Sequence, residues 1–395
     1  MRNLKSLFVA GASSLLIAGL ALAAPTAPAP VGTPAAMPTA VVASAPMKAP
    51  PKATKDMQAV LDALGALGGK PIDTLPPTAA RTQPSPADAV KAVLLKKLGK
   101  EPMPQAVAAV EDREIQSAGK EKIKIRIYTP AGKGPFPVIV YFHGGGWVIA
   151  DLDTYDSSPR ALANGAGAIV VSCDYRKAPE NKFPAAHDDA FAAYQWVLAN
   201  AASFNGNVAK VAVAGESAGG NLAINVALKA RDSKVQLPAY ELLVYPVAGT
   251  DMTTPSYVTN EFAKPLNKSM MEWFVKQTLA TPAQALDPRI DLVHRTDLKG
   301  LPPTMVVTAE IDPLRSEGQA LAKALKAQGV KTTAIDFTGV THEFFGMGAA
   351  VAKAKDAEKQ ASAALKAAFK AVKMPKATMP ATMAPTPVMA PATTR

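Results

Sequence analysis

The sequence has a single cysteine, Cys173, among its 395 residues, so no disulfide can form within the chain. Exported proteins often use disulfides, but 48% of these residues are apolar, enough for a large core that needs none. Cys173 lies in the apolar run V-V-S-C-D-Y. We therefore interpret it as a packing residue rather than as a nucleophile.

Aromatic residues are also scarce, at 6%, and they do not interleave with basic residues as in nucleic-acid-binding motifs. Lysine and arginine number 43 against 32 acidic residues, which gives a formal net charge of +11. Several of these lysines lie in an alanine-rich segment, residues 353–373, which we interpret as a solvated helical face. We expect no nucleic-acid partner, while weak attraction to an anionic surface stays open.

Long apolar runs are missing except near the beginning of the sequence, where residues 7–22 follow Arg2 and Lys5 and end in A-L-A at 21–23. A charged start, an apolar centre and small residues before a cleavage point are the pattern of an export signal peptide. We predict a signal peptide over residues 1–23 and a periplasmic or extracellular protein. A retained membrane anchor is the alternative, but the run is short for a membrane span. No cysteine follows it to receive a lipid, so we expect no stable membrane insertion after cleavage.

Proline and alanine dominate two segments that lack apolar periodicity. We interpret residues 24–55 as a disordered linker and residues 373–395 as a disordered tail. The residues between them, 56–372, form one predicted domain without internal repeats.

Helices and apolar strands alternate within this domain. Amphipathic helices are predicted over residues 57–64 and 86–98. Two strands of alternating polarity follow, and then uniformly apolar strands, which are typical of a mostly parallel sheet covered by helices on both faces. The predicted strands span residues 111–116, 122–129, 138–142, 168–173, 211–214, 242–245, 305–308 and 333–337. Residues 251–300 interrupt this rhythm and, with residues 56–98, are predicted to form a cap over the carboxyl edge of the sheet.

The motif G-E-S-A-G at 215–219 follows one of these strands and precedes a helical run. A strand, a tight turn and a helix around such a motif are typical of a nucleophile elbow. The glycines remove side chains that would collide in the turn, and the N–H groups at the helix start favour negative charge. We predict Ser217 as the nucleophile. A glycine-rich turn with a capping serine is the alternative.

A second motif, H-G-G-G-W at 143–147, stands at the end of another buried strand. A tetrahedral intermediate needs N–H donors aimed at its oxyanion, and three consecutive glycines leave the backbone N–H groups unobstructed. We interpret His143 as holding this loop rather than as a base. The predicted oxyanion hole consists of Gly144, Gly145, Gly146 and Ala218.

A serine nucleophile needs a histidine base. The sequence has four histidines, and His342 lies just beyond the last predicted strand, where a loop would reach the carboxyl edge of the sheet. His187 begins a long helix and is expected on the surface or behind the site, and His294 lies in the predicted cap. We therefore predict His342 as the base.

The base in turn needs an orienting carboxylate. Asp312 follows a buried strand and precedes Pro313, which forces a turn. Glu310 and Asp336 are nearby competitors, but Glu310 should face away from Asp312 and Asp336 lies within a strand. The predicted triad of Ser217, Asp312 and His342 has the chain order of α/β hydrolases.

With these motifs the chain resembles the bacterial hormone-sensitive-lipase-like family of α/β hydrolases, over about residues 56–372. The resemblance implies an α/β-hydrolase fold with a mostly parallel, eight-stranded sheet and a helical cap. It also implies hydrolysis of esters with short to medium acyl chains and no metal or organic cofactor. The likeness is carried by H-G-G-G-W at 143–147, D-Y-R-K-A-P-E at 174–180, F-P-A-A at 183–186, G-E-S-A-G-G-N at 215–221, D-P-L-R at 312–315 and His342.

Two positions depart from the family pattern: Glu216 stands where aspartate is more usual, and Lys177 stands where an apolar residue is common. Neither departure touches a predicted catalytic role. We interpret Tyr175, Arg176 and Glu180 as a scaffold network rather than as substrate contacts.

The sequence therefore predicts a serine carboxylesterase that acts on a small-molecule ester through an acyl-enzyme. Enzymes of the same fold that act on amides, lactones or acetylated polysaccharides are alternatives, because only the pocket separates them. A non-catalytic small-molecule-binding protein is the alternative from another class. Receptors of this architecture lose the triad histidine, which is present here as His342.

Overall fold

The computed structural model of this chain describes residues 51–118 and 121–372. The predicted signal peptide, most of the predicted linker and the predicted tail lie outside these residues, so those predictions stay untested. Within the described part of the chain, no helix is both long enough and apolar enough to cross a membrane.

A single sheet of eight strands forms the centre of the described residues, in the order β1-β2-β4-β3-β5-β6-β7-β8. Its strands are β1 (Ala109–Gln116), β2 (Lys122–Thr129), β3 (Phe136–Phe142), β4 (Ile169–Asp174), β5 (Gly206–Glu216), β6 (Glu241–Val244), β7 (Thr304–Ile311) and β8 (Thr332–Thr341). β2 pairs antiparallel with both β1 and β4. All pairs from β4 to β8 are parallel. The predicted fold, a mostly parallel sheet preceded by a strand pair of alternating polarity, is confirmed.

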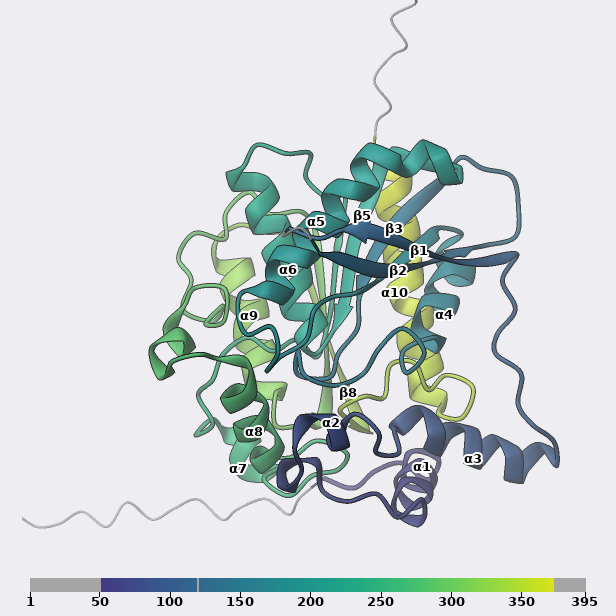
Figure 1. Ribbon diagram of the computed structural model, residues 1–395, viewed down its shortest axis with the longest axis vertical. Coiled ribbons are helices and arrows are strands. Elements are labelled where there is room, and N and C mark those ends of the chain that lie inside the picture. Colours follow the sequence, from purple (N-terminus) through teal and green to yellow (C-terminus); the bar gives the residue numbers. More distant parts are fainter. Residues whose placement is uncertain (1–50, 119–120, 373–395) are drawn as a thin grey trace, which may run out of the picture. The chain divides into compact units, whose positions relative to one another are not determined.

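Helices cover both faces of this sheet, and each face has its own apolar cluster. In Figure 1, α5 (Ala185–Asn200), α6 (Ala218–Asp232) and α9 (Arg315–Ala327) lie on one side of the strands. The opposite side carries α4 (Ser157–Ala166) and the long α10 (Ala352–Ala371). Because the central strands are buried on both faces, their sequences are uniformly apolar.

A third group of helices lies at one end of the sheet, the lower end in Figure 1, and we call them the cap helices. They are α1 (Lys55–Ala66), α2 (Pro77–Ala80), α3 (Pro86–Leu98), α7 (Pro255–Thr259) and α8 (Lys268–Thr278), with short 3-10 turns at η1 (Ile72–Thr74) and η3 (Pro282–Leu286). A further turn, η2 (Ala201–Phe204), follows α5. The cap helices come from the two chain segments in which the sequence predicts a cap, residues 56–98 and 251–300.

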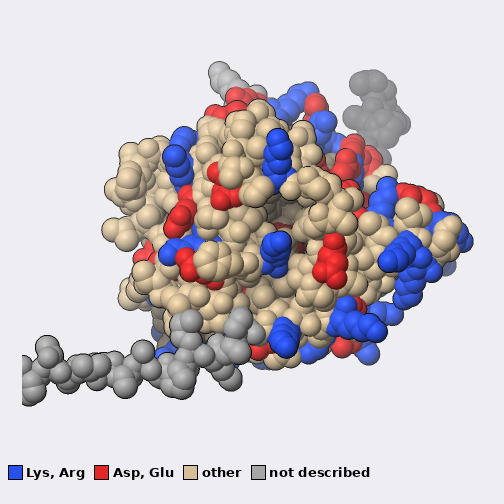
Figure 2. Space-filling view, turned by 90° about the horizontal axis from the view of Figure 1, so that it is seen from below, with Lys and Arg blue, Asp and Glu red and all other residues tan. Residues whose placement is uncertain are grey.

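The cap helices lie at the carboxyl edge of the sheet, which is the edge where β8 ends. The Thr341 hydroxyl at the end of β8 donates a hydrogen bond to the sulfur of Met57 in α1, at 3.6 Å. On this side of the molecule the surface is mostly uncharged and hollowed near its middle, with basic side chains gathered toward one edge (Figure 2).

Candidate active site

Ser217 stands between β5 and α6 with backbone angles of φ 57° and ψ −120°. A non-glycine residue at positive φ is strained. The turn needs glycine on both sides, because a side chain on Gly219 would collide with the carbonyl oxygen of Phe142, and one on Gly215 with the carbonyl of Gly219. This is the sharp turn that the motif predicts, and it holds the Ser217 side chain at the carboxyl edge of the sheet.

The three residues of the predicted triad meet at that edge. His342 Nε2 lies 2.9 Å from Ser217 Oγ, and His342 Nδ1 lies 2.7 Å from Asp312 Oδ2. The second oxygen of Asp312 accepts the Leu314 N–H at 2.8 Å, which fixes the carboxylate in its turn. All three side chains are buried, with Ser217 4%, His342 2% and Asp312 0% exposed. The arrangement lets a proton pass from Ser217 to an imidazole that a carboxylate orients.

The two competing carboxylates face elsewhere. Glu310 accepts the backbone N–H of Gly339 at 2.7 Å. Asp336 accepts the Thr308 hydroxyl at 2.7 Å and forms an ion pair with Arg315 at 2.6 Å. Only Asp312, among these candidates, contacts the imidazole of His342.

The other histidines are engaged away from Ser217. His143 Nδ1 contacts the carbonyl oxygen of Gly144 at 2.8 Å, and the exposed His294 contacts Asp291 at 2.8 Å. His187 is 6% exposed, which rules out the surface, one of its two expected positions. It lies 2.8 Å from the amide oxygen of Asn221 in α6, because the first turn of α5 packs onto that helix. Burial lowers the pKa of His187 to about 4, so it stays neutral near pH 7.

The pKa of His342 is moved by opposing effects. Burial, the largest single effect, lowers it, but the charge and hydrogen bond of Asp312 together with the carboxylates of Glu343 and Glu216 outweigh burial. The result is a pKa above the usual value of a histidine, which stabilises the imidazolium that forms when Ser217 loses its proton.

The predicted oxyanion loop follows β3 directly. Gly145 and Gly146 have positive φ values of 92° and 58°, which glycine adopts without strain. The Tyr175 hydroxyl donates to the carbonyl oxygens of His143 and Gly144 at 2.9 and 3.1 Å. These hydrogen bonds fix the start of the glycine loop. Ala218 is the first residue of α6, where N–H groups have no partner within the helix.

α8 covers this loop from the cap side. A side chain on Gly146 would collide with the ring of Phe274, so the two residues are packed without a gap. The Thr278 hydroxyl donates to the carbonyl oxygen of Gly146 at 3.2 Å, and the carbonyl of Thr278 accepts the Phe183 N–H at 2.9 Å. The helix α8 therefore packs directly over the oxyanion loop.

Arg81, just after α2, makes contacts with distant loops that the sequence does not indicate. Its guanidinium donates to the carbonyl oxygens of Val148 and Ala178, both at 2.8 Å, and pairs with Glu180 at 2.6 Å. Arg81 thereby ties the N-terminal cap segment to the strand-end loops beside the site. No local motif could have predicted it, since the partners lie at least 67 residues away in the sequence.

The predicted scaffold network is present beside Arg81. Arg176 pairs with the buried Asp189 of α5 through two hydrogen bonds of 2.8 and 2.9 Å. Lys177, which departs from the family pattern, forms an ion pair with Asp174.

Glu216, next to the nucleophile, is buried among tyrosines. The hydroxyl of Tyr141 donates to it at 2.6 Å, and the hydroxyl of Tyr245 donates to its other oxygen. Burial raises the pKa of Glu216 to about 7, although these hydrogen bonds oppose the rise. The ring of Tyr245 also lies 4.5 Å from that of His342. Tyr245 therefore contacts both the base and the carboxyl group of Glu216.

No group of three or more histidine, cysteine, aspartate or glutamate side chains among residues 51–118 and 121–372 is arranged to hold a metal ion. The chemistry that this site supports is attack by Ser217 on an acyl carbon, with His342 as proton acceptor.

Comparison with known proteins agrees with this geometry. Residues 139–346 match the model of an α/β-hydrolase-fold family. The chain is 39% identical over 267 residues to carboxylesterase NlhH of Mycobacterium tuberculosis, covering 66% of this chain and 83% of that protein. It is 35% identical to an arylesterase of Saccharolobus solfataricus, covering 65% and 82%.

Solved structures give the same result. A thermostable esterase of Pseudomonas putida ECU1011 superposes with a TM-score of 0.73 at 34% identity, covering 83% of this chain and 100% of that one. An esterase of Pyrobaculum calidifontis superposes with a TM-score of 0.69 at 37% identity, covering 76% and 95%. The chain belongs to the hormone-sensitive-lipase-like family of α/β-hydrolase carboxylesterases.

Proposed function

We propose that this chain is a serine carboxylesterase that cleaves esters with short to medium acyl chains through an acyl-enzyme. Hydrolysis of carboxylic esters follows from the family to which the chain belongs. The observation that carries the serine mechanism is the hydrogen-bonded series from Ser217 Oγ to His342 Nε2 and from His342 Nδ1 to Asp312.

In the first half of the proposed reaction, Ser217 Oγ attacks the ester carbonyl while His342 Nε2 takes its proton. The N–H groups of the glycine loop and of Ala218 stabilise the oxyanion. His342 then gives the proton to the leaving alcohol. In the second half, water attacks the acyl-enzyme, His342 takes the proton of that water, and the proton returns to Ser217 Oγ as the acid leaves.

Two features support a preference for small acyl groups. α8 packs against the oxyanion loop through Phe274 and Gly146, which supports a pocket of limited depth beside that loop. A relative that is 32% identical to this chain is an ethyl acetate hydrolase of Pseudomonas putida, and the chain covers 79% of it. We infer that the pocket accepts acyl chains up to a limited length and that the ester is a small molecule.

The value of kcat/KM should rise with acyl chain length to an optimum at about four to eight carbons and then fall. Each buried methylene contributes roughly 0.8 kcal/mol until the pocket is full, after which further methylenes clash or stay in water. The measurement is kcat/KM on p-nitrophenyl esters from acetate to palmitate, with emulsified triolein as a separate substrate.

A rise that continues to palmitate, or strong activity on triolein, would contradict the limited pocket. Matched lactones and anilides belong in the same panel, because the triad also suits a lactonase, an amidase or a deacetylase. A higher kcat/KM on any of these than on every simple ester would overturn the proposed substrate class.

We further propose that the protein is exported and that its mature form begins near Ala24, as the A-L-A sequence at 21–23 indicates. Mass spectrometry of the protein outside the cytoplasm should find this N-terminus. An intact Met1 in a membrane fraction would support a retained anchor instead.

A further inference from the structure

Glu343, the residue directly after His342, has a backbone φ of 68°. This left-handed region suits glycine, whereas a glutamate there is strained. Strain of this kind persists only where the surroundings hold the residue in place. The contacts of the Glu343 side chain show what holds it.

The hydroxyl of Tyr155 lies within 2.7 and 2.6 Å of the two oxygens of Glu343 and donates to that carboxylate. Tyr155 is 5% exposed and belongs to the segment just before α4. Its hydroxyl also packs against the oxyanion loop so closely that a side chain on Gly144 would collide with it. Tyr155 therefore joins the loop that carries the base to the loop that is predicted to hold the oxyanion.

The same carboxylate faces the reactive nitrogen of the base. Glu343 Oε1 lies 3.8 Å from His342 Nε2, the atom that is 2.9 Å from Ser217 Oγ. Asp312 contacts the other ring nitrogen at 2.7 Å. The imidazole thus lies between two carboxylates, one on each nitrogen.

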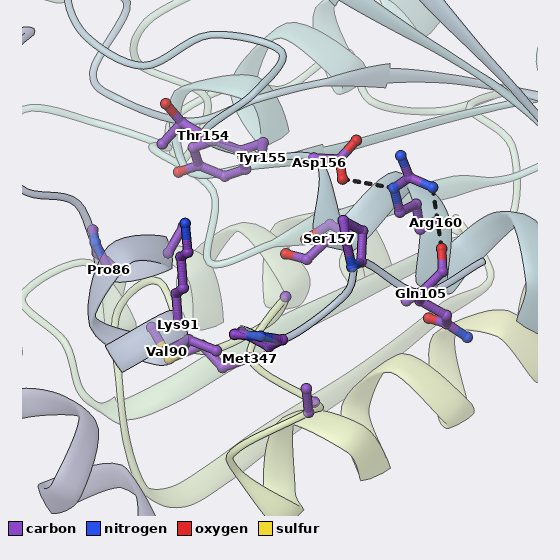
Figure 3. Close-up of a pocket in the computed structure, with 18 of the residues that line it drawn as sticks. Pro86, Val90, Lys91, Gln105, Thr154, Tyr155, Asp156, Ser157, Arg160 and Met347 are labelled. Carbon is purple, nitrogen blue, oxygen red and sulfur yellow. Dashed lines mark hydrogen bonds and ion pairs between the residues drawn. The ribbon is translucent and has the colours of Figure 1, made fainter. Parts of the chain in front are cut away.

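Packing does not explain why a glutamate stands here. Glu343 and Tyr155 border a cavity of about 600 Å³, which Figure 3 shows between α3, the Thr154–Tyr155 segment and Met347. The carboxyl groups of Glu216 and Glu358 line the same cavity. A glycine at this position would remove the backbone strain, so the backbone geometry does not favour a glutamate.

We propose that Glu343 is a positioning residue: held by Tyr155, its carboxylate keeps the imidazole of His342 aligned with Ser217 and stabilises the protonated ring. This inference rests on the proposed function, in which His342 is the base. The protonated ring forms each time Ser217 or water gives up a proton, so a negative charge 3.8 Å from Nε2 acts where the charge develops.

The expected signature is a shift of the pH profile. His342 must be neutral to accept a proton, so kcat/KM falls as the pH drops through its pKa. Glu343 raises that pKa, after Asp312 and against burial. Removing the charge in Glu343→Gln should lower the acid-limb pKa of kcat/KM by about one pH unit. On the plateau, kcat should fall about threefold, because a weaker base removes the proton more slowly.

Two further variants separate charge from position. Tyr155→Phe keeps the carboxylate and removes the hydroxyl that holds it, so plateau kcat should fall and the acid-limb pKa should drop by less than in Glu343→Gln. Glu343→Gly places the favoured residue at positive φ and also lacks the carboxylate. It should show the same pH shift as Glu343→Gln without the backbone strain.

The other ionisable groups near the ring need one control. Burial raises the pKa of Glu216 to about 7, so the shift caused by Glu343→Gln must persist in a Glu216→Gln background. Asp312 is unchanged in all of these variants, so its effect on the pKa of His342 cancels in the comparison. Among the described residues, the groups that face His342 or its carboxylate neighbours include Asp312, Glu343, Glu216, Tyr245, Tyr155, Tyr141, Glu358 and Lys355.

An unchanged acid-limb pKa in both Glu343 variants, or an equal loss of activity at every pH, would overturn the inference. Failure of both variants to fold, judged by near-UV circular dichroism, would assign the carboxylate a structural role and also overturn it. A wild-type enzyme without an acid limb, or one that keeps its activity after Ser217→Ala, would instead contradict the proposed function.

Discussion

Ser217→Ala is expected to fold as the wild type does and to lose esterase activity by roughly 10⁵- to 10⁶-fold, as for other serine hydrolases that lose a triad member. The change deletes one buried hydroxyl whose partner is His342 Nε2 at 2.9 Å. Alanine is no larger than serine, so the turn at φ 57° loses no room. Without the hydroxyl no acyl-enzyme can form, and only binding and the oxyanion donors remain.

The measurement is kcat/KM on p-nitrophenyl butyrate, with labelling by a fluorophosphonate probe as an independent readout. Wild-type protein should be labelled and Ser217→Ala should not. More than a few per cent of wild-type activity in the variant, or labelling that persists, would remove Ser217 from its role. A wild-type protein that is neither active nor labelled would favour a small-molecule-binding protein.

His342→Ala is expected to be about as damaging as Ser217→Ala, because members of a triad act as a unit. Among the described residues, the imidazole of His342 is the group placed to accept the proton of Ser217 and to pass it to the leaving alcohol. In this variant the Asp312 carboxylate still accepts the Leu314 N–H, but it has no imidazole to orient.

His187→Ala is the matched control, because His187 is a second buried histidine close to α6. Its contact with Asn221 and its lowered pKa indicate a neutral, structural ring. We expect it to lower the Tm, at a cost of about 1–3 kcal/mol for the lost hydrogen bond, with kcat within about tenfold of wild type. If folded His187→Ala were inactive and His342→Ala were active, the assignment of the base would be wrong.

Local sequence patterns were sufficient to predict those features that depend on residues adjacent in the sequence. The elbow around Ser217 lies within five residues, G-E-S-A-G, and its strained turn needs only the two glycines that the motif contains. The central strands were also predictable, because burial on both faces leaves an uninterrupted apolar run. β5 begins at Gly206, earlier than predicted; its residues before Val211 are mostly exposed or half-buried, so no apolar run marks them as strand.

Contacts between distant segments could not be predicted in the same way. Arg81 meets Glu180 across 99 residues, and Tyr155 meets Glu343 across 188 residues. The burial of His187 likewise depends on α6, which begins 31 residues later, at Ala218. No local pattern around Arg81 or Tyr155 indicates the distant partner that each of them meets.

By itself, the sequence determined the fold class, the identity of the nucleophile candidate and the order of the triad, because periodicity and tight turns are encoded by adjacent residues. Only the tertiary structure decided that Asp312, rather than Glu310 or Asp336, meets His342, that α8 packs on the oxyanion loop and that a glutamate stands at positive φ beside the base. Those features depend on distances between side chains of separate strands and helices, and such distances exist only once the sheet and its covering helices have packed.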